Sequence, residues 1–76
     1  RQEGGDVIKT NDIIGAVARI TVNIPTGRLG EAMIEEPYRM KNAVKHIDDA
    51  PLQKGDKVVV IDIEGGHWLV RKQNNL

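Results

Sequence analysis

The sequence predicts an all-β fold, a small five-stranded barrel that is closed or partly open. Short apolar runs, either β-branched or alternating with polar residues, follow one another along the chain, and turn-forming clusters separate them. Phe is absent, so aliphatic side chains must supply most of the core. Seventy-six residues are enough for one small domain. Five strands in so short a chain are typical of a small barrel with glycines at its corners, here Gly15, Gly27, Gly30 and Gly55.

The stretch from Leu52 to Lys72 predicts a β-hairpin. Val58 to Ile63 is β-branched at every position except Asp62, which favours a strand over a helix. Gly65-Gly66 follows at once, and Trp68 to Val70 comes next. Because glycine reaches positive φ without a Cβ penalty, this pair suits the tight turn that joins two strands.

The N-terminal half predicts two further strands. Ala16 to Ile24 alternates between two sets of residues, as in a half-buried strand. Pro25-Thr26-Gly27 ends this strand, since Pro removes a backbone donor and Gly permits a turn. Arg28 to Glu35 then resumes as the second strand. Its inward candidates are Leu29, Ala32 and Ile34.

The segment from Tyr38 to Ile47 fits two secondary structures. Four apolar residues share the helical spacing i, i+3, i+4, i+7: Met40, Ala43, Val44 and Ile47. A strand would instead place four residues on one face, with a bulge near Ala43: Tyr38, Met40, Val44 and His46. The neighbouring strands need edge partners and the flanking turns are short, so we favour the strand.

We expect a lead-in or linker over residues 1–11, the barrel over residues 12–73 and a disordered tail over residues 74–76. The chain begins at Arg1 rather than Met, which suggests a piece of a longer protein. The barrel is expected to be monomeric. Strand alternation predicts its core: Ala18, Ile20, Val22, Val58, Val60, Trp68 and Val70.

The composition argues against catalysis. The chain has no Cys and no Ser, which excludes disulfides, thiolate chemistry and a Ser-His-Asp site. His46 and His67 are the only histidines, and without HxH or HxxxH spacing we expect surface positions rather than a metal site. Glu31-Ala32-Met33 matches the motif before the biotinylated Lys of carrier domains, but Ile34 stands in place of that Lys. We therefore expect no cofactor.

The formal net charge is zero, so no global field attracts nucleic acid or an anionic membrane. Five basic residues share one surface if the first three strands pack side by side: Arg19, Arg28, Arg39, Lys41 and Lys45. Barrels of the OB type bind single-stranded nucleic acid on such a face through stacked aromatics, and only Tyr38 is placed to stack. Nucleic-acid binding through Arg19, Arg39 and Lys41 is therefore the alternative function.

Several short motifs follow one another between Ile13 and Lys72: Ile14-Gly15 with Ala18, Pro25-Thr26-Gly27, Gly30-Glu31, Ala43, Lys54 to Val60, and Gly65 to Val70. In this order and spacing the chain resembles the C-terminal soluble domain of the NfeD family, and looks closest to the short flotillin-associated NfeD-like membrane proteins of Gram-positive bacteria. Ala18 stands where the family often has Gly, and Ile24 where it often has Arg, and these two departures argue against a bound ligand at that corner.

The resemblance implies an OB-like five-stranded barrel, with the third segment as a strand. It also implies a non-enzymatic interaction domain, soluble and cytoplasmic, whose parent is anchored in the cell membrane through segments outside this chain. The implied partner is a flotillin- or stomatin-type (SPFH) membrane protein. Some long family members carry a separate serine protease domain, and nothing in this chain corresponds to it.

The second strand offers a candidate interaction surface. Met33 alternates away from Ala32 and Ile34, so we expect it to face outward between two glutamates. Apolar residues in a charged rim are a common interface signature. We predict that the protein-binding surface includes Arg28, Leu29 and Met33, and that Met33→Asp with Arg28→Glu weakens association without unfolding the domain.

Overall fold

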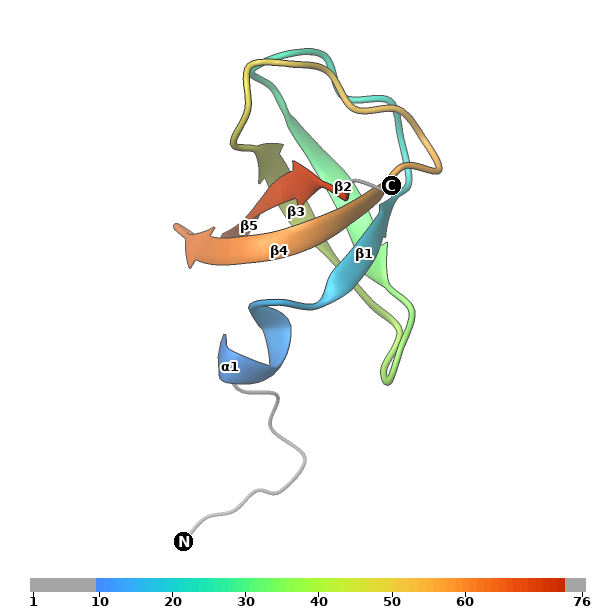
Figure 1. The fold of residues 1–76 in the computed structure, drawn as a ribbon, viewed down its shortest axis with the longest axis vertical. Helices are drawn as coiled ribbons and strands as arrows, with labels where there is room; N and C mark the ends of the chain where they lie inside the picture. The colour runs from blue at the N-terminus through green and yellow to red at the C-terminus, as the bar shows by residue number, and fades with distance from the viewer. Residues whose placement is uncertain (1–9, 74–76) are drawn as a thin grey trace, which may run out of the picture.

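The computed structural model describes residues 10–73, and the expected tail and most of the expected lead-in lie outside this range. The elements are α1 (Thr10–Ile13), β1 (Val17–Ile20), β2 (Leu29–Ile34), β3 (Met40–His46), β4 (Lys57–Glu64) and β5 (His67–Lys72). The strands close into a barrel in the order β1-β2-β3-β5-β4 (Figure 1). Only β3 and β5 pair in parallel. The predicted all-β, five-stranded barrel is confirmed.

The β4–β5 hairpin forms as predicted. Gly65 and Gly66 make its turn, with φ of 59° and 85°. The register shifts between Val60 and Asp62, so Ile61 is the extra residue of a bulge. Because of this residue, Val60 and Ile63 both pack toward the core although they lie an odd number of positions apart. The bulge predicted near Ala43 is wrong, since β3 pairs continuously with β2 through this residue.

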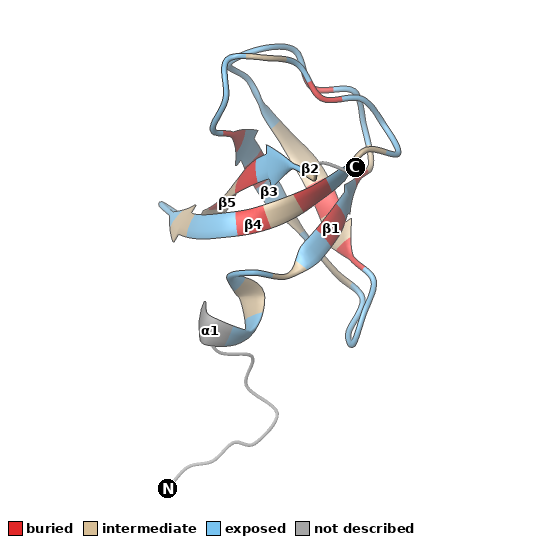
Figure 2. Cartoon of the chain, viewed as in Figure 1, coloured by how far each residue is buried: buried red, intermediate tan, exposed pale blue. Residues whose placement is uncertain are grey.

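The core consists of eleven buried apolar residues inside the barrel (Figure 2): Ala18, Ile20, Ile24, Ala32, Ile34, Val44, Leu52, Val58, Val60, Trp68 and Val70. Six of the seven predicted core residues are among them. Val22 is wrong, because β1 ends at Ile20 and the following loop turns outward, which leaves Val22 48% exposed. In that loop, the Asn23 side-chain oxygen accepts a hydrogen bond from the Lys54 amide at 2.8 Å.

The two ends of the barrel are closed differently. At one end, the loop after β1 and the loop after β3 lie side by side (Figure 1) and pair through a bridge between Ile24 and Leu52. At the other end, half-buried side chains pack against the core: Ile13, Ala16, Met40 and Ile63. The short helix α1, which the sequence analysis did not predict, therefore contributes to the second closure through Ile13.

Three side chains differ from expectation. Leu29, predicted inward, is 59% exposed because it lies on the opposite face of β2 from the buried Ala32 and Ile34. His46, expected at the surface, is buried in phase with Val44, and its Nδ1 lies 2.8 Å from the Ala50 carbonyl oxygen. His67, also expected in solvent, is half-buried, and its Nε2 has no hydrogen-bond partner within the described residues.

Candidate functional site

Four outward side chains form one row across the barrel, which we term the cationic row: Lys57, Arg19, Met33 and Lys41. Arg19 lies opposite Lys57 on β4 and opposite Met33 on β2, and Met33 lies opposite Lys41 on β3. Residues directly opposite on neighbouring strands point to the same face. Met33 therefore lies among the cations of the predicted nucleic-acid face.

The contacts within the row are loose. Arg19 donates from Nη1 to the Gly55 carbonyl oxygen at 3.0 Å, and its Nε lies 3.9 Å from Glu35 Oε1. Both side chains of this ion pair are about half exposed, so it contributes about 0–1 kcal/mol. Arg39 Nη2 lies 4.0 Å from the sulfur of Met33. Among the described residues, Lys41 and Lys57 have no ion-pair partner, which leaves the row positive on a chain of zero net charge.

The structure separates the three residues predicted for protein binding. Leu29 pairs with Lys45 at the start of β2, whereas Met33 pairs with Lys41 near its end. Four residues of extended chain place the two side chains about 13 Å apart along the strand. Arg28 lies in the turn before β2, where its amide donates to the Pro25 carbonyl oxygen at 3.1 Å. Arg28 and Leu29 thus lie at one end of β2, and Met33 lies with the cationic row.

A groove opens where the pairing of β1 with β2 stops. These strands pair only at Arg19↔Met33 and Ile20↔Ala32, since β2 ends at Ile34 while β1 continues to Val17. Backbone groups alternate in direction along a strand, so those of Val17 point toward the β2 side, as those of Arg19 do. No residue of β2 lies opposite them. Among residues 10–73, the backbone groups of Val17 therefore have no strand partner on this side.

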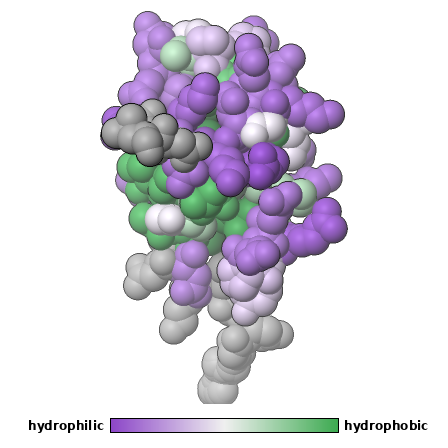
Figure 3. Space-filling model, turned by 45° about the vertical axis from the view of Figure 1, so that its right-hand side comes forward, coloured by the Kyte–Doolittle hydropathy of each residue, from purple (hydrophilic) through white to green (hydrophobic). Residues whose placement is uncertain are grey.

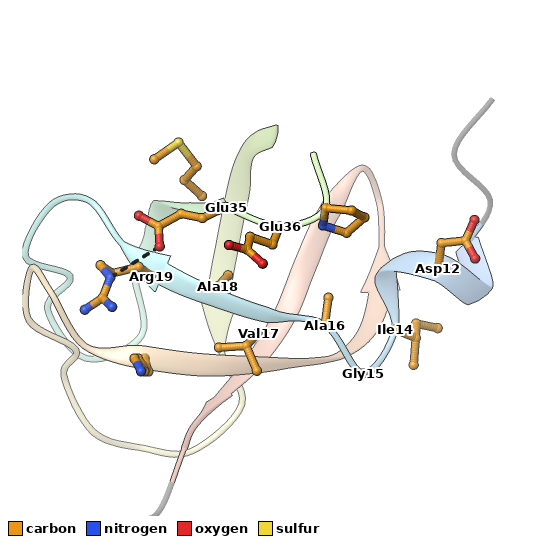
Figure 4. Close-up of a pocket in the computed structure, with 12 residues that line it drawn as sticks. Asp12, Ile14, Gly15, Ala16, Val17, Ala18, Arg19, Glu35 and Glu36 are labelled. Carbon is orange, nitrogen blue, oxygen red and sulfur yellow. Dashed lines mark ion pairs between the residues drawn. The ribbon is translucent and has the colours of Figure 1, made fainter. Parts of the chain in front are cut away.

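This β1 groove has a volume of about 710 Å³ (Figure 4). The segment from Asp12 to Arg19 forms one side, and the turn from Glu35 to Pro37 faces it. A second hollow of about 340 Å³ continues from it, lined by Ile13, Tyr38 and Met40 among others. The sequence analysis missed the groove, because it depends on where one strand ends relative to its partner. Glu36-Pro37, just beyond the end of β2, was the local signal in the sequence.

Apolar side chains also reach the surface on β1 and β4. Val17 is 43% exposed and lies opposite the half-buried Val59, and Ile61 on the β4 bulge is 40% exposed. Figure 3 shows hydrophobic surface gathered in one area of the face in view, with hydrophilic residues around it. Within residues 10–73, no three His, Asp or Glu side chains converge to hold a metal ion. The arrangement of charged and apolar groups is suited to binding another molecule.

Comparison with solved structures shows which proteins share this fold. The chain matches the C-terminal domain of stomatin operon partner protein 1510-C from Pyrococcus horikoshii, with a TM-score of 0.74 and 16% identity over 91% of this chain and 100% of that one. It matches the soluble domain of the NfeD protein YuaF from Bacillus subtilis with a TM-score of 0.75 and 23% identity, over 86% and 79% of the two chains. The fold is that of the NfeD soluble domain.

A third match is the soluble domain of a Corynebacterium glutamicum membrane protein implicated in regulation of membrane protease activity. Its TM-score is 0.70 at 19% identity, over 87% of this chain and 100% of that one. No protein-family model and no curated protein matches the chain. The three structural matches confirm the OB-like barrel that the NfeD resemblance implies. In the part of the chain that the structure describes, no helix is long and apolar enough to cross a membrane.

Proposed function

We propose that the chain is a non-enzymatic protein-interaction domain of a membrane-anchored NfeD-like protein that assists or organises a flotillin- or stomatin-type membrane scaffold. The likeness to the stomatin operon partner protein carries this proposal, because it extends over nearly the whole of both chains. The likeness to the NfeD protein YuaF supports it. In this proposal the barrel is soluble on the cytoplasmic side, and segments outside this chain anchor the parent.

The side chains support a binding role over catalysis. The chain has no Ser or Cys, and His46 is buried against the Ala50 carbonyl group. The outer surface combines exposed apolar residues such as Leu29 with the cationic row. An interface on so small a barrel is limited in area, so we expect a weak contact or one strengthened by several copies.

Co-purification tests the proposal. The tagged parent protein, extracted from membranes in mild detergent, is expected to retain the flotillin- or stomatin-type protein of the same cell. Since Arg28 and Met33 lie at opposite ends of β2, Met33→Asp and Arg28→Glu are made separately. We expect Met33→Asp to reduce the retained partner and to leave the melting temperature unchanged. Val22→Asp, on the exposed loop after β1, is the matched control. Absence of any such partner from the wild-type preparation would reject the proposal.

The cationic row supports one alternative, an OB-type module for single-stranded nucleic acid. Arg19 and Lys41 flank Met33, and Arg39 lies against its sulfur. The single exposed aromatic ring, Tyr38, lies in the β2–β3 turn rather than on the strands, and Glu35 lies beside Arg19. Salt-dependent binding of single strands that disappears when Arg19, Arg39 and Lys41 are neutralised would establish this alternative.

A further inference from the structure

The β1 groove changes character along its length. Arg19 and Lys57 line one part of it, beside Met33. In the hollow that continues from it, apolar side chains dominate the lining: Ile13, Ala16, Ile34, Pro37, Tyr38 and Met40. Ile34 is buried and Met40 is half-buried, so the hollow reaches the edge of the barrel core. The site thus offers cations at one part and an apolar hollow at the other.

Carboxylates lie between these parts. Asp12 and Glu36 line both the groove and the hollow, and Glu35 lines the groove next to Arg19 (Figure 4). A continuous phosphate backbone would bring negative charge against these side chains along its whole length. A peptide carries charge only at particular side chains, so an acidic residue is able to reach the cations while its neighbours avoid the carboxylates. The charge pattern therefore favours a peptide over a nucleic acid.

The geometry points to a binding site for an extended segment of a partner protein in which an acidic residue stands next to apolar ones. The acidic side chain is held by Arg19 and Lys57, and an apolar side chain enters the hollow between Ile13, Tyr38 and Met40. The segment passes along Val17, whose backbone groups face the groove with no strand opposite them. This inference deepens the proposed function and takes from it only the identity of the partner.

The two methionines of the chain report on the two parts of the site. Met33 lines the groove and Met40 lines the hollow, and the sequence has no other Met. The 76-residue chain, labelled with ¹³C at the methionine methyl groups, therefore gives two NMR signals that both belong to the site. Three probes are titrated: a capped peptide containing Leu-Glu-Leu-Glu, its Leu-Lys-Leu-Lys counterpart, and a thymidine oligonucleotide.

We expect the Leu-Glu peptide to shift both methyl signals saturably, with a Kd below about 1 mM. The Leu-Lys peptide and the oligonucleotide should leave both signals in place. Equal binding of the Leu-Lys peptide overturns the inference, as does the absence of any saturable shift with the Leu-Glu peptide. A shift of Met33 by the oligonucleotide also overturns it and assigns the groove to nucleic acid.

Variants on the surface locate the binding. Lys57→Glu removes an exposed cation of the groove and is expected to weaken Leu-Glu peptide binding about tenfold or more. Tyr38→Ala removes a wall of the hollow and should abolish the shift at Met40. Lys54→Glu makes the same charge change at an exposed position outside the groove and should bind as the wild type does. Unchanged binding by Lys57→Glu contradicts the inference.

The outcomes separate this inference from the proposed function. Peptide binding in the groove, without any flotillin- or stomatin-type protein in the co-purification, rejects the proposed partner and keeps the site. Retention of that partner at wild-type level by the parent protein carrying Lys57→Glu, together with no peptide shift, rejects the site and keeps the proposed function.

Discussion

Ile24 and Leu52 form an isolated antiparallel bridge in which the amide of each donates to the carbonyl oxygen of the other, at 2.7 and 2.9 Å. Both side chains are almost fully buried. Neither residue belongs to one of the five strands, so the bridge joins two loops and closes one end of the barrel. The integrity of that end therefore depends on two residues between strands.

Leu52→Ala is expected to destabilise the domain by about 2–5 kcal/mol, because it opens a cavity at the end of the barrel where Ile24 and Leu52 pair. Urea unfolding followed by circular dichroism measures the change. Leu29→Ala, the same substitution at a side chain that is 59% exposed, should stay within about 0.5 kcal/mol of the wild type. Equal costs for the two variants would show that the Leu52 side chain is not part of the core.

Gly30→Ala is expected to cost about 1–3 kcal/mol through overpacking, since a Cβ at this position would collide with the Ile24 side chain. In an Ile24→Ala background both colliding atoms, Cδ1 and Cγ1, are absent, so the same substitution should cost less. A thermodynamic cycle of the four proteins measures the coupling, for which we expect about 0.5 kcal/mol or more. Additive costs would argue against the close packing of Gly30 on Ile24.

Trp68 is 2% exposed and is the only tryptophan. Its fluorescence should therefore be blue-shifted in the folded protein and move to the red on unfolding. Trp68→Ala or Val60→Ala is expected to cost about 2–5 kcal/mol, a large share of the stability of a small domain. A water-like emission maximum before denaturant is added would mean that this core is wrong.

His46→Leu is expected to destabilise the domain by about 1–3 kcal/mol, because the Ala50 carbonyl group loses the hydrogen bond from Nδ1. A carbonyl oxygen only accepts, so Nδ1 is the donor in this hydrogen bond. His67→Leu is the matched control: it removes a buried ring nitrogen without a partner in the described residues and should cost less. The reverse order, measured by urea unfolding, would contradict this account of the two histidines.

Local patterns predicted most of the fold. The hairpin around Gly65-Gly66 followed from β-branched runs and a turn that needs positive φ, and both glycines have it. Alternation failed at Val22, where hydrogen bonds to distant segments decide the path of the loop. The Thr21 amide donates to the carbonyl oxygen of Glu31 on β2, and the Asn23 side chain accepts from the Lys54 amide. Such contacts between distant segments leave no periodic signal in the sequence.

The candidate site was less predictable than the fold. The alternation of residues along the strand correctly predicted that the Met33 side chain points away from the core, although that side chain is half-buried. Its position between Arg19 and Lys41 depends on strand register, which the sequence does not specify residue by residue. The groove beside Val17 depends on the unequal lengths of β1 and β2 at one end, and His46 was misplaced because its partner, Ala50, lies in a loop.

Direct binding to the proposed partner tests the central claim, that this barrel is a protein-interaction domain for a flotillin- or stomatin-type scaffold. The purified 76-residue chain is titrated against the flotillin- or stomatin-type protein of the same organism, reconstituted in lipid nanodiscs. We predict saturable binding that Met33→Asp weakens and Val22→Asp leaves unchanged. Absence of saturable binding, with the chain shown to be folded by the Trp68 emission, would contradict the account.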